Sequence, residues 1–254
     1  MSQAPTPKDS APSDGPRRSS DHARQPSDQA KQPSVASRRA ALTDSLSEPR
    51  QVTDVGELRA LAHPLRLRLM EELVINDPAT DTATATELAE RLGESPANCS
   101  WHLRQLAKYG YIEEAPGGVG RERRWRAVLA VRNWENPTGD PEYTAASDAA
   151  SDILYDHEYQ AYRAQRAWRA SEPADWRSSA FSLQSLGWLT ADELRKLSED
   201  FFELLQPGLQ RLADPASRPP GARLIRFVSW GIPARPYVQD KTATQPDPEE
   251  NQDA

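Results

Sequence analysis

One short stretch of the chain, SPANCSWHLRQLAK at residues 95–108, places amide, indole and cationic side chains at helical spacing. At about 3.6 residues per turn, the apolar side of such a helix carries Cys99, Leu103, Leu106 and the terminating Gly110. The opposite side carries Ala97, Asn98, Trp101, Arg104, Gln105 and Lys108. Amides and cations donate to base edges or bind phosphate, and an indole stacks on sugars. This face could therefore read a nucleic acid, although the periodicity alone fits an ordinary solvated helix of an all-α bundle equally well.

Capping residues predict where this helix and the helix before it begin. Ser95 suits the N-cap and Pro96 the first helical position. Upstream, TATE at residues 84–87 is a capping box, in which the threonine hydroxyl and the glutamate carboxylate each accept from a backbone amide. The helix that follows ends at Gly93 and buries Leu88, Ala89 and Leu92. Two helices joined by about three residues around a glycine have helix-turn-helix spacing, in which the second helix enters the major groove.

The residues just before this pair predict two more helices. Residues 54–73, DVGELRALAHPLRLRLMEEL, repeat leucine close to the helical period. Pro64 cannot continue a helix but suits a first turn. We therefore expect a short helix ending near Leu61, a kink capped by His63, and a second helix starting at Pro64.

The residues after the expected reading helix predict a β-hairpin. Two strand-like stretches, Tyr111–Glu114 and Arg124–Val128, flank the glycine-rich sequence PGGVGRE. The hairpin tip and descending strand carry Arg121, Arg123 and Arg124, which could reach phosphates or the minor groove as a wing. A phosphate-cradling loop is the weaker interpretation, because the glycines lack a following Gly-Lys-Ser/Thr and lead into a strand.

These motifs together resemble the winged helix-turn-helix of the ArsR-like family of bacterial transcriptional regulators. The resemblance rests on AHPLR, the serine-proline start, SWHLRQL and the arginine-bearing GRERRWRAV, and it covers roughly residues 54 to 130. It implies a homodimer on a two-fold operator, with the helix from Ser95 to Lys108 in the major groove. Metal sensors of this family usually place a cysteine pair on the preceding helix. That helix reads TELAERLG here, which puts thiolate metal sensing in doubt.

Composition and charge limit the classes of protein. The chain has 254 residues, 37% hydrophobic residues, 22 prolines, one cysteine and a net charge of −7. A single cysteine excludes an internal disulfide framework and a thiolate zinc cluster, and no stretch approaches the roughly 18 apolar residues of a membrane span. Residues 95–126 contain six cations and three carboxylates, which makes a local basic patch on an acidic chain. We expect a cytoplasmic protein without a signal peptide.

Few other residues suggest chemistry. Cys99 lies on the apolar face, where a free cysteine is usually a small core residue. His102 flanks the reading face and could donate to a phosphate or pack between helices. Asp152, Asp156 and His157 come close on a helix, where a solvated charge cluster is a more ordinary interpretation than a metal site. No catalytic frame is recognisable, so we expect no enzymatic activity, no metal and no cofactor.

The C-terminal part predicts helices with apolar faces. One helix, SDILYDHEYQAYRAQRAWRASE, should pack through Leu154, Tyr155, Tyr159, Tyr162 and Trp168. A second begins at the capping box Thr190–Glu193 and carries an apolar stripe to Pro207, beyond which it could resume as far as Leu212. ARLIRFVSW, residues 222–230, is strand-like. Core packing and a small-molecule effector pocket would use the same aromatic residues.

The sequence thus predicts a mainly α fold, in which a winged helix-turn-helix is followed by a helical C-terminal region. The predicted parts are a disordered tail at 1–49, the DNA-binding domain at 50–133, a helical dimerisation or effector region at 145–232 and a disordered tail at 233–254. A linker is expected through NPTGDPEYT, residues 136–144, and residues 1–48 should have nothing to dock.

The expected function is that of a sequence-specific DNA-binding regulator, a repressor acting as a homodimer. The alternative is a protein-interaction module that keeps the winged fold without reading DNA. The expected DNA-contacting residues are Ser95, Ala97, Asn98, Trp101, His102, Arg104, Gln105, Lys108, Arg121, Arg123 and Arg124. The expected dimer contacts are Leu58, Leu61, Leu194, Leu197, Phe201, Leu204 and Leu205.

Overall fold

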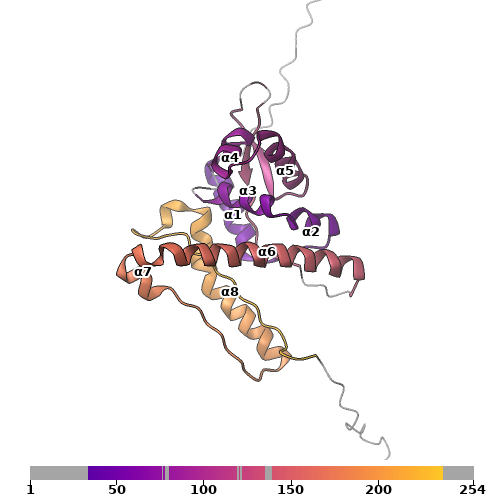
Figure 1. Ribbon diagram of the computed structural model, residues 1–254, viewed down its shortest axis with the longest axis vertical. Helices are drawn as coiled ribbons and strands as arrows, with labels where there is room; N and C mark the ends of the chain where they lie inside the picture. The colour runs from indigo at the N-terminus through magenta and orange to yellow at the C-terminus, as the bar shows by residue number, and fades with distance from the viewer. Residues whose placement is uncertain are drawn as a thin grey trace, which may run out of the picture. The chain divides into compact units, whose positions relative to one another are not determined.

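A bundle of short helices with a small sheet precedes two long helices (Figure 1). The computed structural model describes residues 34–75, 77, 80–118, 120, 122–134 and 139–236. The chain divides into two units, Met1–Ser34 and Val35–Ala254, and the elements named below belong to the second. Its helices are α1 (Val35–Ser47), α2 (Val55–Leu61), α3 (Pro64–Val74), α4 (Ala85–Leu92), α5 (Pro96–Lys108), α6 (Pro141–Trp168), α7 (Ala174–Ser179) and α8 (Ala191–Ala213), with 3₁₀ turns at Arg169–Ser171 and Pro215–Ser217. Its strands are β1 (Arg50–Gln51), β2 (Ala83–Thr84), β3 (Ile112–Ala115), β4 (Arg124–Ala127) and β5 (Arg132–Asn133).

The starts of α3, α4 and α5 and the end of α4 lie where the capping residues predict. The His63 ring accepts a hydrogen bond from the Leu65 amide, so His63 is the N-cap of α3 and Pro64 its first residue. The capping box of α4 is complete in both directions, and Gly93 ends that helix at φ +67°. This left-handed conformation favours glycine because a Cβ would clash with the following carbonyl. The Ser95 hydroxyl accepts from the Asn98 amide and starts α5.

The predicted hairpin is present and belongs to a three-stranded sheet. β4 lies between β3 and β2, antiparallel to both, with Ile112 opposite Ala127 and Ala83 opposite Trp125. The sequence does not predict β2, because a strand of two residues, the second of which is the N-cap of α4, carries no periodic signal. The hairpin itself, residues 112–127, is called the wing. A separate parallel pair joins β1 to β5, with Arg50 opposite Arg132.

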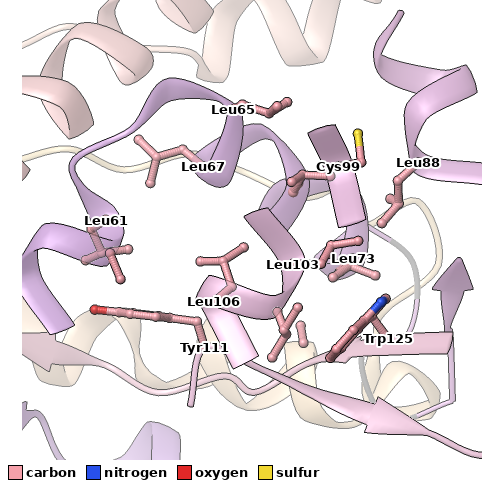
Figure 2. Packing of buried hydrophobic residues seen from close by; sticks show 14 of the residues in the cluster. Leu61, Leu65, Leu67, Leu73, Leu88, Cys99, Leu103, Leu106, Tyr111 and Trp125 are labelled. Atoms are coloured by element: carbon pink, nitrogen blue, oxygen red, sulfur yellow. The ribbon is translucent and has the colours of Figure 1, made fainter. Parts of the chain in front are cut away.

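One hydrophobic core holds the helix-turn-helix and the wing together (Figure 2). Its fully buried members include Leu69 of α3, Leu88 of α4, Leu103 and Leu106 of α5 and Tyr111 before β3. The Tyr111 hydroxyl donates to the Glu57 carbonyl of α2, which satisfies its polar end within the core. The interlocking of α3, α4 and α5 with β3 and β4 fixes which face of α5 remains outside.

The start of α6 belongs to the same core. Tyr143, Ala146 and Ala150 are buried in it, and the Tyr143 hydroxyl donates to the Val52 carbonyl over 2.6 Å. The prediction of a linker through residue 144 is therefore wrong for Pro141–Thr144, which form the first turn of α6. Asp140 caps that turn by accepting from the Glu142 amide, a start signal that the proline-rich composition obscured.

The prediction of a disordered tail over residues 1–49 is wrong for its last part. Val35–Ser47 form α1, which packs against the C-terminal end of α8 through Leu42 and Leu46. Arg39 donates to the Ala213 carbonyl over 2.8 Å. Two leucines four residues apart are enough to bury one helical face, because α8 offers an apolar surface to receive it. Residues 1–33 and 237–254 of the predicted tails lie outside the described residues.

Two expectations for the C-terminal region are corrected. Residues 222–230 form no strand, because no neighbouring strand pairs with them in the described part of the chain. The aromatic residues of α6 that were expected to pack, Tyr155, Tyr159, Tyr162 and Trp168, are instead 42–57% exposed. α8 runs from its predicted capping box through Pro207 to Ala213. Among the described residues, no helix has the length and apolarity needed to cross a membrane.

Candidate nucleic-acid interface

The outer face of α5 presents polar and aromatic side chains to solvent. Ser95, Ala97, Asn98, Trp101, Arg104 and Lys108 are exposed, and Gln105 is half-buried. Cys99, Leu103 and Leu106 on the inner face are fully buried, so the helix cannot rotate without breaking the core. Burial also raises the pKa of the Cys99 thiol, which suits a core residue rather than a reactive one. The predicted division of α5 into two faces is thus the division that the structure shows.

A groove of about 510 Å³ runs between α5 and the wing. It is lined by Ala85 and Thr86 of α4, by Pro96, Ala97, Ser100 and Arg104 of α5, and by Glu122, Arg123 and Trp125 of the wing. The small side chain of Ala97 occupies little of the space, and two cations, Arg104 and Arg123, line it with one carboxylate, Glu122. A phosphate backbone needs such a shape and charge to approach a helix closely. The arginine at position 121 lies outside the described residues.

Arg124 does not point outward from the wing as predicted. Its Nε donates to the Thr82 hydroxyl over 2.7 Å, and one terminal nitrogen donates to the Thr82 carbonyl over 2.8 Å. The same guanidinium pairs with Glu87, whose carboxylate also completes the α4 capping box. Accepting from the Thr84 amide and pairing with Arg124 lower the pKa of Glu87. Arg124 therefore ties the wing to the start of α4, and its hydrogen bonds are used inside the fold.

The other wing arginines differ in how firmly they are held. Arg126 is buried and bonds to Glu113 of β3 directly across the hairpin. Arg123 pairs with Glu114 at 3.3 Å, and both side chains are more than half exposed. An exposed pair of this kind contributes little to stability and exchanges readily for a phosphate partner. Among the described wing arginines, Arg123 is the residue best placed to meet DNA.

His102 lies beneath the outer face of α5 and is not part of it. It is 4% exposed, and its Nδ1 accepts a hydrogen bond from Arg66 Nε over 3.2 Å. Burial first, and then the neighbouring His63 and Arg66, lower the pKa of His102 to about 4. The imidazole is thus neutral near pH 7 and carries its proton on Nε2. Of the two expectations for His102, the burial of its ring favours packing between helices over donation to a phosphate.

Arg66 connects the end of α2 to the reading helix. The same guanidinium donates to the carbonyls of Arg59 and Ala60, two of the unpaired groups at the end of α2. It also lies 5.5 Å from the centre of the Trp101 ring, and Trp101 meets the His102 ring edge-on at 4.7 Å. These contacts orient the exposed indole from below. Reasoning from the sequence missed Arg66, although its place in the AHPLR motif was the available signal.

One carboxylate lies beside the reading face. Glu94, just before the N-cap of α5, accepts from the Asn98 side-chain amide over 3.4 Å and from Arg68 over 3.2 Å. The first of these bonds is long and exposed, so Asn98 can give it up for a base at little cost. Arg68 and the positive end of the α5 dipole offset the Glu94 charge.

The comparison with known proteins supports this geometry over a defined segment. Residues 61–114 match the family described as a helix-turn-helix domain. The match spans α3, α4, α5 and most of β3, the elements that build the reading face. A helix-turn-helix domain points to DNA binding and transcription regulation. No curated protein matches the chain.

Among the remaining candidates for chemistry, His157 has a structural partner. His157 of α6 bonds to Glu71 of α3 over 3.1 Å and helps to hold these helices together. Within the described ranges, no group of three or more histidine, cysteine, aspartate or glutamate residues is arranged to hold a metal ion. The aromatic residues of α6 that could have enclosed an effector are largely exposed.

Proposed function

We propose that this chain is a sequence-specific transcription regulator that acts as a repressor and binds a two-fold operator as a homodimer. The observation that carries the proposal is the outer face of α5, where Asn98, Trp101 and Arg104 are exposed on a helix whose inner face is locked into the core. A face fixed in this way can enter a major groove without rearrangement. The groove beside it, lined by Arg104 and Arg123, gives the DNA backbone a place to lie.

The side chains divide into two roles within this proposal. Asn98 and Gln105 read base edges, because an amide donates and accepts in the pattern that adenine presents. Arg104, Lys108 and Arg123 bind phosphate, and Trp101 packs on a sugar. Arg124 and His102 act indirectly, by holding the wing and the indole in place. Arg66 joins them as a positioning residue.

The surface proposed for dimerisation lies on α8. Leu58 and Leu61, which were expected to contribute, are buried in the core of their own chain and cannot also face a partner. On α8, Leu197 is 55% and Leu204 is 78% exposed, and Phe201 lies between them on the same face. Leu194 and Leu205 are half-buried at the edges of this stripe. A two-fold dimer doubles the DNA contacts, which a single winged helix is too small to provide for tight specific binding.

The experiment that tests DNA reading is selection of bound fragments from the genome of the host by the purified full chain, followed by titration of variants. Asn98→Ala should relax the preference at one position per half-site, at a cost of about 1–3 kcal/mol for the preferred base. Lys108→Ala should weaken binding to all sequences alike and reduce the salt slope by about one. Arg59→Ala serves as the control, because Arg59 is an exposed cation that pairs with Glu142 on another face.

Three outcomes would count against parts of this proposal. If no fragment is enriched, the chain does not read DNA, and the winged fold serves protein interaction instead. An equal loss on every sequence for Asn98→Ala and Lys108→Ala would remove Asn98 from the reading set. A loss for Arg59→Ala as large as that for Lys108→Ala would mean that net charge, and not the face, determines affinity.

The dimer is tested by replacing Leu197 and Phe201 together with Asp. Two charges in a buried stripe carry a severe cost, so sedimentation should show a folded monomer with weakened operator binding. Glu199→Gln with Glu203→Gln changes two charges on the opposite, exposed side of the same helix and should leave the dimer intact. A double variant that remains a dimer of unchanged affinity would exclude this stripe.

A further inference from the structure

The segment between α7 and α8 is apolar and carries no charge. Residues 178–191, SSAFSLQSLGWLTA, contain no Asp, Glu, Lys or Arg, although 27% of the chain is charged. Residues 181–189, which we call the apolar arm, contain five large apolar side chains within nine residues. A connecting loop that faced water would carry polar or charged side chains at such positions. The composition of the arm is that of a segment that becomes buried.

The arm finds no partner within the described part of its own chain. There, residues 181–189 make no hydrogen bond and no ion pair. Their large side chains are between 53% and 103% exposed, namely Phe181, Leu183, Leu186, Trp188 and Leu189. Trp188 has the highest of these values, so its indole touches almost nothing that the structure describes. Burial against another surface would remove the cost of leaving these groups in water.

Both ends of the arm are nevertheless anchored. The Ala180 amide donates to the Trp176 carbonyl at the end of α7. At the other end, Thr190 and Glu193 form the reciprocal capping box that starts α8. The arm is therefore an extended segment held at two helix ends, which limits the entropy it must lose on binding.

A receiving surface of matching chemistry is present on the same chain. It consists of exposed aromatic residues of α6, α8 and residues 222–232, which we call the aromatic face: Tyr155, Tyr159, Tyr162, Phe201, Phe227 and Trp230. Tyr155 of α6 and Trp230 are in ring contact, with their centres 5.6 Å apart. Ion pairs hold residues 222–232 in place, since Arg223 binds Glu172 and Arg226 binds Glu158. The large apolar side chains of this segment remain 45–71% exposed.

We propose that the apolar arm of each copy packs onto the aromatic face of a second copy, so that two copies exchange arms in the dimer. This inference rests on the proposed homodimer and assigns the segment that would form it. A second copy is the favoured occupant because each chain carries both complementary parts, the arm and the face, and reciprocal exchange closes the assembly at two. A nucleic acid or an anionic membrane would need cations, and the arm has none.

The available area is sufficient for a stable dimer. One buried aromatic side chain contributes about 150–250 Å², and each partner of a standard interface contributes about 800 Å². The arm supplies Phe181 and Trp188 at 76% and 103% exposure, and the six residues of the aromatic face are 36–66% exposed and contribute the remaining part of their area. Exposed apolar surface on this scale is rare on a monomer and marks an interaction site. The recognition face of α5 shares no residue with it, so both copies remain able to bind DNA.

The proposal is tested with the full chain and two matched double variants. Leu186→Asp with Trp188→Asp places two charges on the apolar positions of the arm, and Ser182→Asp with Gln184→Asp places the same two charges on its polar positions. Sedimentation should show that the first pair raises the dimer dissociation constant by about a hundredfold or more, while the second pair changes it little. Circular dichroism should show both variants folded. An equal effect of the two pairs, or a dimer unchanged by the first pair, would overturn the assignment.

A second measurement keeps the test decisive if the first variant fails to fold. A photo-crosslinking benzoylphenylalanine replaces Trp188, and two copies of different tag length are mixed. The expected product joins the two copies, with the attachment point within residues 155–232 of the partner. Crosslinks confined to one chain, crosslinks elsewhere on the partner, or crosslinks to operator DNA would each overturn the proposal. If the wild-type chain selects DNA fragments while the arm proves dispensable, the proposed function stands and this inference fails.

Discussion

The helices α5 and α8 carry similar sequence signals, but their apolar faces lie in opposite environments. Each begins at a Ser or Thr N-cap and repeats apolar residues at steps of three and four. In α5 the stripe is fully buried, with Leu103 and Leu106 at 0% exposure, whereas in α8 Leu197 and Leu204 are more than half exposed. An apolar stripe therefore predicts that one face of a helix will be covered. It does not say which part of the chain, or which copy, covers it.

The difference arises from the neighbours that each helix has. α5 packs against α3, α4 and β3, which come from adjacent sequence and cover its apolar face. α8 is covered at its C-terminal end by α1, where Leu42 and Leu46 bury Ala213. The rest of its stripe receives no comparable cover from the described residues of its own chain. This is the region in which we place the dimer.

The largest expected effect comes from truncating one leucine in each helix. Leu103→Ala should lower the free energy of unfolding by about 2–5 kcal/mol, because it leaves a cavity in a fully packed core. Leu204→Ala should change the stability of the monomer by no more than about 0.5 kcal/mol, since its side chain already meets water. Denaturant titration at several protein concentrations separates the monomer from the dimer. A large monomer effect at Leu204 would show that α8 is covered within one chain.

Removing α1 should destabilise the C-terminal end of α8, which α1 covers, and leave the helix-turn-helix intact. Deletion of residues 1–48 removes Leu42 and Leu46 and exposes the residues they cover. Full burial of one leucine side chain stabilises a protein by about 1.5–3 kcal/mol. Deletion of residues 1–33 keeps α1 and is the control, with nearly unchanged thermal unfolding. Calorimetry should show the loss only for the longer deletion. Identical curves for the two deletions would mean that the contact between α1 and α8 does not contribute to stability.

Acid should destabilise the winged helix through its buried histidine. The unfolded chain binds a proton at His102 near its ordinary pKa of 6.5, and the folded chain does so only near a pKa of about 4. Because the unfolded state then holds more protons, stability falls as the pH drops from 6.5 toward 4, by at most about 1.4 kcal/mol per pH unit from this group. The pKa of His63 is also lowered, by burial and by Arg66, and acts in the same direction.

His102→Asn isolates this contribution, because an asparagine oxygen can still accept from Arg66 but does not titrate. Denaturant titrations at about pH 4.5 and about pH 7 give the free energy of unfolding of wild type and variant. This free energy should change less between the two pH values in the variant than in wild type. His157 of α6, replaced by Asn, is a control from outside the cluster. A slope unchanged by His102→Asn would place the acid-sensitive group elsewhere.

The smallest expected difference concerns the two capping boxes, one in each region. Thr84→Ala and Thr190→Ala should each cost about 0.5–2 kcal/mol, because each frees an amide at a helix start. The cost of Thr84→Ala should lie at the upper end of this range, since Thr84 is buried and its partner Glu87 also binds Arg124 of the wing. Thr190 is exposed, and its box lies within the first turn of α8. Thermal unfolding of the two variants compares them, and the reverse order would argue against the coupling of the wing to α4.

Local signals were sufficient for much of the winged helix. The caps at His63, Thr84 and Ser95, the glycine at 93 and the hairpin glycines act within a few residues of the chain, so their effects could be read directly. The outer face of α5 followed from periodicity, because a helix fixes which residues share a side. The start of α6 was missed, since its composition resembles a linker and obscured the cap at Asp140, and the packing of this turn on α2 and its bond to Val52 have no local signal.

Only the tertiary structure decided which residues far apart in the sequence contact one another. Sequence placed Arg124 and His102 among the DNA contacts, but Thr82 and Glu87 hold the first and Arg66 holds the second. A guanidinium or an imidazole has the same chemistry on a surface and in a core. Its direction is set by whichever partner the fold brings within hydrogen-bond distance, and that partner can be 36 or 42 residues away. The sequence by itself determined the helices α2 to α5 and their faces, because these depend on local geometry. The helix α1, the covered face of α6 and the roles of individual charged residues depended on long-range packing.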